Sequence, residues 1–391
     1  MQNNISEVLI EYLRRNKQSL VHLNKQITND TDFAIEYDYE YIIKYLELFN
    51  ENLSKIKKKI NKKLKPKGNI LIILSYNEPF IMSIIPILNA LLAGNIVTVK
   101  PSGKALLFFR NIWIASGIKD KLDLKLELFE KDHCEIENLI PSMDSVYFFG
   151  GYENAKKLAS KCAESLVEFN PEIEAADCKV IYLKNPTNKE IYTDIEMTIH
   201  DSFLHTGQSC QRIQGLFINK QCYAKYKRLL QATINKLVKN KNIEKYIPED
   251  YKPNIFLLQN LKSQLGNVNK IIKSDTASGF PYLIDNPPKN EAFIKSAQFL
   301  PTIWISPYET IDDLTISLNS RRYKLGVNIV SHNKTFVNKL IHSTHFSRFT
   351  VNSSHTFVRY NEGWGGISPT GYNGYKSWLE HFSYPYAVIS D

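Results

Sequence analysis

The stretch Asn69-Ile-Leu-Ile-Ile-Leu74 is a short, unbroken apolar run, which is typical of a strand that is covered on both faces of a sheet. A turn over residues 75–79 follows, and residues 80–93 form an apolar segment of helical length. A second apolar run, Ile96-Val-Thr-Val-Lys100, ends at Pro101. A strand, a helix and a strand within about thirty residues predict a βαβ unit with parallel strands.

The same alternation continues toward the C-terminus. Further strands are expected at residues 145–149, 179–183, 299–305, 326–330 and 349–352, and further helices near residues 152–166, 190–204, 311–320 and 335–342. Residues 1–67 predict two or more helices with polar connections. We therefore predict an α/β protein with two doubly wound domains and a cleft between them.

Length and composition indicate the class of protein. A chain of 391 residues, of which 43% are hydrophobic, can bury the cores of two or three domains. The N-terminal residues do not join a basic segment to an apolar one as a secretion signal does, and no stretch approaches the roughly 18 apolar residues of a membrane span. We expect a soluble, cytoplasmic protein without a membrane span.

The net charge of +9 comes from one local run of lysines. Residues 55–67 contain eight lysines and no acidic residue, and without them the net charge falls to +1. Apolar residues recur along this region, at Ile42, Leu46, Phe49, Leu53, Ile56, Ile60 and Leu64. This spacing predicts that the lysines occupy the solvent-exposed face of an amphipathic helix. A patch for phosphate, an acidic carrier or nucleic acid is the alternative, but the run lacks interleaved aromatic residues, so we expect no nucleic-acid partner.

The five cysteines are widely spaced, with no C-x-x-C pair and no cluster with histidines, so we expect neither disulfides nor a metal site. Four of them are expected to be small buried apolar residues. The exception is Cys210, which ends the segment Phe203-Leu-His-Thr-Gly-Gln-Ser-Cys210 directly before an apolar run at residues 213–218. A thiol behind a Gly-Gln turn is a candidate nucleophile, because a thiol reacts as its thiolate.

Six ordered segments between residues 65 and 390 resemble blocks of the aldehyde dehydrogenase superfamily, of which the chain looks like a short, divergent member. The segments are Lys65-Pro-Lys-Gly-Asn-Ile-Leu-Ile-Ile-Leu-Ser-Tyr-Asn-Glu-Pro79, Ala90-Leu-Leu-Ala-Gly-Asn-Ile-Val-Thr-Val-Lys-Pro-Ser102, Phe149-Gly150-Gly151, Phe203 to Cys210, Val351-Asn352, and Trp364-Gly365-Gly366 with Gly371. They are similar to the family's P-W-N-x-P turn, K-P-S block, F-T-G-S turn, G-Q-x-C box and closing blocks. The last two are its v-N and F-G-G-x-x-x-S-G sequences.

The resemblance implies a catalytic mechanism. Cys210 would attack the carbonyl of an aldehyde, and the side chain of Asn77 and the cysteine's backbone N–H would stabilise the alkoxide of the thiohemiacetal. Transfer of hydride to NAD or NADP would leave a thioester. Glu172, in Glu172-Ile-Glu-Ala, matches the glutamate of the family's E-L-G-G block, which acts as the general base for hydrolysis.

The resemblance also implies a cofactor site, although no G-x-G-x-x-G is present. The cofactor-binding positions are Lys100, Ser102, Gly103, Lys104, Gly150, Gly151 and Phe299. Gly103 stands where the family commonly has a glutamate that binds the ribose hydroxyls, and Lys104 follows it. The loss of the acid and the gain of a cation make NADP(H) plausible. A second family glutamate, in the E-x-F-G-P block, is replaced by Ala297 in Ala297-Gln-Phe-Leu-Pro301.

Both glycines of the E-L-G-G block are missing, which leaves two alternatives to aldehyde oxidation. If Glu172 is not a base, the enzyme would suit the reduction of an acyl-CoA or acyl-carrier thioester to an aldehyde with NADPH. A catalytically degenerate binding or assembly subunit is the alternative from another class of protein.

The resemblance divides the chain into N-terminal helices with a cofactor domain over residues 1–171, a catalytic domain over residues 172–375, and a final segment over residues 376–391. That final segment would return to the cofactor domain or to an oligomer interface. Residues 386–390 look like the family's last strand, which often joins a partner's sheet, so we expect a homodimer or homotetramer.

Overall fold

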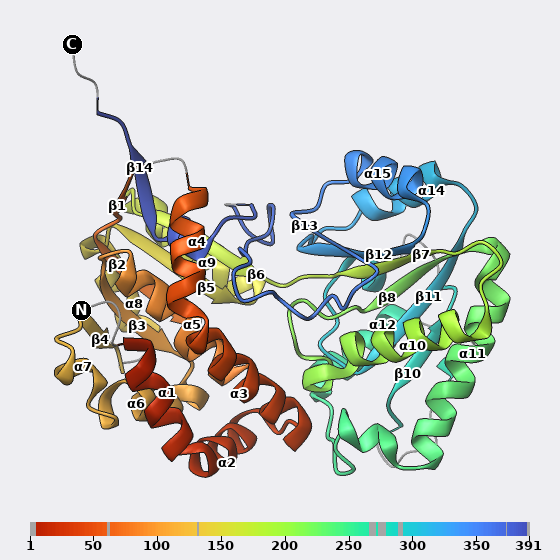
Figure 1. Cartoon of the computed structure of the whole chain (residues 1–391), viewed down its shortest axis with the longest axis horizontal. Helices are drawn as coiled ribbons and strands as arrows, with labels where there is room; N and C mark the ends of the chain where they lie inside the picture. Colours follow the sequence, from red (N-terminus) through yellow and green to blue (C-terminus); the bar gives the residue numbers. More distant parts are fainter. Residues whose placement is uncertain are drawn as a thin grey trace. The chain divides into compact units, whose positions relative to one another are not determined.

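The computed structural model describes residues 5–60, 63–130, 133–265, 271–272, 279–287, 292–372 and 374–388 (Figure 1). By their internal contacts the residues divide into two compact units. The first unit comprises Met1–Ile173, Arg359–Gly365 and Gly371–Asp391, and the second comprises Glu174–Val358 and Gly366–Thr370. The expected limit between residues 171 and 172 falls inside strand β6, Glu168–Ile173, and the expected domain limits stay predictions.

A parallel sheet forms the centre of the first unit. Its described strands, in spatial order, are β4 (Leu126–Leu128), β3 (Ile96–Pro101), β2 (Asn69–Leu74), β5 (Ser145–Gly150) and β6. In sequence order, β2 is the first strand of this sheet. Strands β3 and β4 follow on one side of β2, and β5 and β6 follow on its other side. In open α/β sheets, ligands bind at the carboxyl ends of the strands where the order reverses, which here is between β2 and β5.

The helices of the first unit follow the expected alternation. They are α1 (Ile5–Arg15), α2 (Lys17–Thr28), α3 (Asp32–Glu47), α4 (Phe49–Lys59), α5 (Pro79–Leu92), α6 (Leu106–Arg110), α7 (Ile118–Lys121), α8 (His133–Leu139), α9 (Tyr152–Glu164) and α16 (Trp378–His381). Helix α5 joins β2 to β3, so the predicted βαβ unit is confirmed. In the described part of the chain, no helix combines the length and apolar character needed to span a bilayer.

The lysine run is only partly helical, so the prediction of one amphipathic helix is wrong at its C-terminal end. Helix α4 ends at Lys59, and Lys63–Pro66 form strand β1. Lys55 and Lys57 are exposed, as expected. Lys67, however, is buried, with its Nζ 2.8 Å from Glu168 Oε1 and over the ring of Tyr147. Burial lowers the pKa of Lys67, and the ion pair opposes that effect.

The last strand lies earlier in the sequence than expected. Strand β14 spans Ser383–Tyr386 and pairs antiparallel with β1, beside which it is drawn in Figure 1. Residues 387–388 lie outside any strand, and residues 389–391 lie outside the described residues. The strand expected at residues 386–390 therefore has only its first residue within β14.

A second, larger sheet forms the centre of the second unit. Its described strands, in spatial order, are β13 (Arg348–Val351), β12 (Gly326–Ser331), β7 (Cys178–Tyr182), β8 (Gly215–Asn219), β11 (Thr302–Tyr308), β10 (Tyr282–Asp285) and β9 (Ile271–Ile272). Neighbouring strands are parallel except for β9 and β10. The helices are α10 (Asn188–Phe203), α11 (Lys220–Lys239), α12 (Ile255–Leu265), α13 (Ala292–Lys295), α14 (Ile311–Asn319) and α15 (Lys334–Ser343). This arrangement confirms the expected second α/β unit.

A buried ion pair ties α10 to this sheet. Lys179 of β7 is fully buried, and its Nζ donates to Asp194 Oδ1 at 2.9 Å and to Thr198 Oγ1 at 2.8 Å, both on α10. Tyr226 of α11 donates its hydroxyl proton to the other oxygen of Asp194 at 2.6 Å. Because a buried ammonium group is costly without partners, α10 has one favourable position on the sheet. Helix α10 leads directly into the segment that carries Cys210.

Gly215 provides a test of the packing in the second sheet. It lies opposite Trp304 of the neighbouring strand, and a Cβ atom at residue 215 would overlap the buried indole ring. We expect Gly215→Ala to lower the free energy of unfolding by about 2 kcal/mol or more, measured by urea denaturation. Gly103→Ala is the control, because among the described residues no atom lies within 4 Å of its added Cβ. Equal stabilities of the two variants would contradict the packing described here.

Candidate active site

Cys210 lies on a turn with an unusual backbone. After α10 ends at Phe203, His205, Thr206 and Gly207 all have left-handed conformations, with φ values of 54°, 54° and 77°. Such values are unfavourable for residues other than glycine, and they persist only where the surrounding structure holds them. At Gly207 a side chain is also excluded, because its Cβ would lie 2.7 Å from the carbonyl oxygen of Leu300. The turn leaves the thiol of Cys210 half-buried.

A buried arginine holds this turn against a distant segment. The guanidinium group of Arg212 donates to the carbonyl oxygen of Gly207 at 3.4 Å, and to carbonyl oxygens further along the chain, those of Gln298, Leu300 and Thr302. Burial lowers the pKa of Arg212 to about 9, so the group still carries its charge at neutral pH. The planar fork of an arginine suits several carbonyl acceptors at once. It therefore fixes the cysteine turn and the segment before β11 as one piece.

Phe299, a predicted cofactor-binding residue, lies in the segment that Arg212 binds. Its side chain is half-buried between Gln298 and Leu300, whose carbonyl oxygens accept from Arg212. The side chain of Gln214 adds two bonds, because its Nε2 donates to the carbonyl oxygen of Ser296 at 2.8 Å and its Oε1 accepts from the backbone N–H of Gln298 at 3.0 Å. The second unit therefore brings Phe299 and the turn of Cys210 into one rigid substructure.

The other cysteines with described side chains are buried. Burial raises the pKa of Cys162 and Cys178 to about 11 and also raises the pKa of Cys222. The expectation of buried apolar cysteines is confirmed for these residues, while the side chain of Cys134 lies outside the described ones. No disulfide and no cluster of metal-ligating side chains occurs within the described residues.

Several predicted residues meet at the carboxyl edge of the first sheet. Asn77 follows β2 and precedes α5, and Lys100 lies near the end of β3, where it is buried with its Nζ 3.1 Å from the carbonyl oxygen of Pro101. Gly150 ends β5, and Gly151 is the N-cap of α9. Asn77, Gly150 and Gly151 flank the reversal of strand order between β2 and β5, and Lys100 lies on the neighbouring strand β3. Lys100 is therefore not an exposed residue at the end of a strand.

The residues after β3 are accessible from solvent. The backbone N–H of Ser102 donates to the carbonyl oxygen of Leu74 at 2.9 Å, which ties the end of β3 to the end of β2. Gly103 and Lys104 are both exposed. The ammonium group of Lys104 lies over the ring of Tyr76, 4.5 Å from its centre. At this distance the face of the ring attracts the cation. A positive charge therefore stands beside the turn that carries Asn77.

Glu172, the predicted base, lies within a strand. It is half-buried in β6, where it pairs with Phe149 of β5 and also forms a bridge with Gly371. The backbone at Glu172 is therefore paired on both sides. Glu172, Asn77 and Lys100 belong to the first unit, whereas Cys210 and Phe299 belong to the second.

Two features of the second unit were missed at the level of the sequence. The first is the arginine clamp, since Arg212 has no sequence signal beyond its position two residues after Cys210. The second is a buried pair next to the cysteine turn, in which Nε2 of His355 lies 2.8 Å from Oδ2 of Asp177. The only signal for this pair is a histidine shortly after the Val351-Asn352 block.

The burial of the cysteines predicts their order of reactivity. At pH 7.5, a thiol with a pKa of about 11 is a thiolate in roughly one molecule in three thousand. We expect iodoacetamide to label the half-buried Cys210 at least tenfold faster than Cys162, Cys178 or Cys222, measured by peptide mass spectrometry. The unfolded protein is the control, in which all of these rates converge. Faster labelling of Cys162 than of Cys210 in the folded protein would contradict this expectation.

Comparisons with known proteins agree with this geometry. The profile of the aldehyde dehydrogenase family matches residues 3–248. The chain is 25% identical to 4,4'-diapolycopene aldehyde oxidase of Methylomonas sp over 174 residues, which cover 44% of this chain and 32% of the relative. It is 24% identical to aldehyde dehydrogenase family 3 comG of Dictyostelium discoideum over 336 residues, which cover 80% and 66%. The chain thus spans less than two thirds of the length of these two relatives.

The fold has solved counterparts as well. The structure of succinic semialdehyde dehydrogenase from Streptococcus pyogenes, in complex with NADP+, superposes with a TM-score of 0.79 at 15% sequence identity. The superposition covers all of this chain and 90% of that one, which shows that the fold is shared. Because the family profile matches well over half of the sequence, the chain belongs to the aldehyde dehydrogenase family.

Proposed function

We propose that this protein is an NAD(P)-dependent dehydrogenase that oxidises an aldehyde to a carboxylic acid through a covalent intermediate on Cys210. The observation that carries the proposal is the setting of Cys210, which is half-buried on a turn with left-handed residues while Cys162, Cys178 and Cys222 are buried. Membership of the aldehyde dehydrogenase family supports the same chemistry.

The residues at the carboxyl edge of the first sheet fit a dinucleotide. Gly150 stands where β5 meets α9, and a Cβ there would lie 2.5 Å from the ring of Phe148, so a side chain at this position would require the ring to move. The N-terminus of α9 presents N–H groups to an anion such as a pyrophosphate. Lys100 would reach the ribose from β3, and Lys104 would reach a 2′-phosphate. When bound, the nicotinamide supplies a hydride acceptor.

Each proposed catalytic residue then has one task. The Cys210 thiolate forms a bond to the carbonyl carbon, and the electron pair of the C=O bond moves to the oxygen. Asn77 and the backbone N–H of Cys210 would donate hydrogen bonds to that oxygen, which stabilises its charge. After the carbon has lost hydride, Glu172 would remove a proton from the water that attacks the thioester, and the C–S bond breaks to release the acid and the thiolate.

The reduction of an acyl thioester to an aldehyde is the second candidate, and the position of Glu172 favours it. Its backbone is paired on both sides in β6, so its carboxylate has less freedom to approach a water molecule than one on a glycine-rich loop. In that reaction the acyl group would move from a carrier thiol to Cys210, and no base for hydrolysis would be needed.

We also propose that the chain forms a homodimer or homotetramer. Strand β14 pairs only with β1 among the described strands, and apolar side chains at its end and just beyond it are exposed, with 44% exposure at Tyr386 and 65% at Val388. An unpaired strand edge with exposed apolar residues favours pairing with another chain.

Turnover assays test the proposed reaction. We expect the purified protein to reduce NAD or NADP in the presence of an aldehyde, with a rise in nicotinamide absorbance, and Cys210→Ala to abolish this activity. Cys162→Ala is the matched control and should retain activity, because Cys162 is buried in α9. Turnover of acyl-CoA with NADPH but of no aldehyde would contradict the oxidation and favour the reductase. Aldehyde oxidation that persists in Cys210→Ala would contradict both.

Cofactor preference tests the role of Gly103 and Lys104. We expect kcat/KM for NADP to equal or exceed that for NAD, because Lys104 would attract the 2′-phosphate. Gly103→Glu should lower kcat/KM for NADP about tenfold through repulsion between like charges, and leave NAD nearly unaffected. The exposed position has room for the new side chain. Gly103→Gln adds a side chain of similar size without charge. An equal loss of kcat/KM for NADP in Gly103→Glu and Gly103→Gln would therefore contradict the electrostatic explanation.

A further inference from the structure

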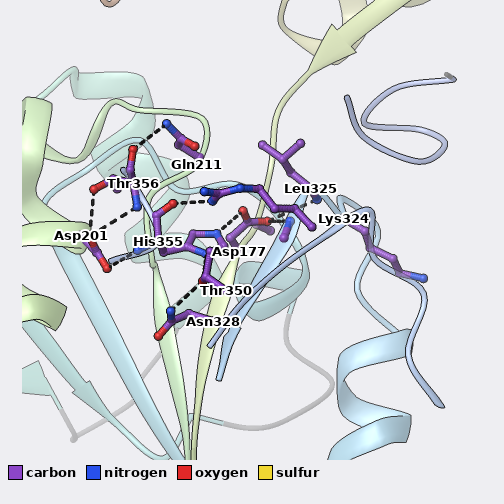
Figure 2. Close-up of polar contacts among 12 residues, drawn as sticks. Asp177, Asp201, Gln211, Lys324, Leu325, Asn328, Thr350, His355 and Thr356 are labelled. Atoms are coloured by element: carbon purple, nitrogen blue, oxygen red, sulfur yellow. Dashed lines mark hydrogen bonds and ion pairs between the residues drawn. The ribbon is translucent and has the colours of Figure 1, made fainter. Parts of the chain in front are cut away.

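A buried cluster of two acids and a histidine lies near Gln211, the residue directly after Cys210 (Figure 2). Asp177, Asp201 and His355 each have no exposed surface, and we call these residues the His355 cluster. We infer that the His355 cluster positions the backbone of the Cys210 turn, so that His355 is a positioning residue for the nucleophile. The inference rests on the proposed function of Cys210.

The ring of His355 is bound at both nitrogens. Nε2 lies 2.8 Å from Asp177 Oδ2, and Nδ1 lies 3.0 Å from Thr350 Oγ1. The hydroxyl oxygen of Thr350 accepts from Nδ2 of Asn328 at 2.7 Å, so its proton can point toward Nδ1. All of these groups are satisfied when Nε2 carries the proton and donates it to Asp177. The network therefore selects one ring orientation and one tautomer.

The first residue of β12, Gly326, contacts both the Asp177 carboxylate and the His355 ring. The second oxygen of Asp177, Oδ1, accepts from the backbone N–H groups of Gly326 at 2.9 Å and Leu325 at 3.3 Å. A Cβ at residue 326 would lie 2.7 Å from Cε1 of His355, so only glycine allows the ring to pack here. Asp177 thus joins the beginnings of β7 and β12 through a buried carboxylate.

Asp201, in the last turn of α10, binds the chain on both sides of the His355 ring. Its Oδ2 accepts from the backbone N–H of His355 at 2.8 Å. Its Oδ1 accepts from the hydroxyl groups of Ser354 at 2.6 Å and Thr356 at 2.8 Å. A buried carboxylate requires several donors, and residues 354–356 supply them. This segment is therefore fixed to the end of the helix that leads to Cys210.

The cluster reaches the cysteine turn through three hydrogen bonds. The backbone N–H of Ile213 donates to the carbonyl oxygen of Asp201 at 3.0 Å, and that of Gln214 donates to the carbonyl oxygen of Asp177 at 3.1 Å. Nε2 of Gln211 donates to the carbonyl oxygen of Thr356 at 3.1 Å. Gln211 directly follows Cys210, so the cluster holds the exit of the turn while Arg212 holds its entry at Gly207.

The first experiment removes the side-chain link and leaves the cluster itself intact. Gln211→Met keeps the size of the side chain and loses the bond to Thr356. We expect kcat for aldehyde to fall about tenfold with the KM for the cofactor unchanged. We also expect iodoacetamide to label Cys210 at pH 9.5 at least threefold faster than in the wild type, because a released turn exposes its half-buried thiol. The matched control is Gln221→Met, at an exposed position on the first turn of α11.

The second experiment changes the histidine. His355→Phe fills the space without a donor to Asp177, whereas the amide nitrogen of His355→Gln can still donate to that carboxylate. We expect His355→Phe to turn over aldehyde more slowly and to be labelled at Cys210 faster than the wild type. His355→Gln should have a kcat and a labelling rate closer to those of the wild type. If His355→Phe does not fold, the inference is tested by comparing His355→Gln with Gln211→Met. We expect smaller changes in kcat and in the labelling rate of Cys210 in His355→Gln than in Gln211→Met.

The outcomes separate this inference from the proposed function. If Gln211→Met loses thermal stability but keeps wild-type kcat and labelling, the cluster is only structural and the inference is wrong. If the wild type turns over neither aldehydes nor thioesters, the proposed function fails. Faster labelling of Cys210 in Gln211→Met would still support positioning in that case, because labelling does not depend on turnover.

Discussion

The arginine clamp is the interaction on which the candidate nucleophile depends. Arg212 is buried, and its guanidinium group binds the carbonyl oxygen of Gly207 together with those of Gln298, Leu300 and Thr302. A turn with consecutive left-handed residues is unfavourable by itself, so the surrounding structure must supply the free energy that maintains it. Because backbone carbonyls rather than side chains are the acceptors, the clamp specifies the path of the chain near Cys210 and tolerates changes in the side chains of residues 298–302.

The two sheets divide the proposed work between them. The first sheet brings Asn77, Lys100 and Gly150 to the carboxyl ends of neighbouring parallel strands, where glycines and a helix N-terminus suit an anionic ligand. The second sheet holds Cys210 at the amino end of β8, where Arg212 and the His355 cluster fix the backbone from two directions.

Local patterns in the sequence predicted most of the fold, because unbroken apolar runs and turn residues report directly on buried strands. The strand positions around residues 70, 97, 147, 180 and 328, the α/β class and the family were all confirmed. The errors arose where distant residues compete with a local pattern. Lys67 belongs to a lysine run, yet it is buried, because it forms an ion pair with Glu168 and lies over two aromatic rings. The contacts of Arg212 and His355 join residues about ninety and more than a hundred positions apart, and no periodicity reports such pairs.

The buried lysine of β7 has a consequence for how the second unit assembles. Lys179 lies in an interior strand of the sheet, and its ammonium group has partners only when Asp194 and Thr198 of α10 are in place. Closing the sheet over this charge before the helix arrives would bury an unpaired cation. The docking of helix α10 and the covering of β7 are therefore energetically coupled in this unit. The same ion pair thus fixes α10, from whose end the segment leading to Cys210 begins, independently of the carbonyl groups of residues 298–302.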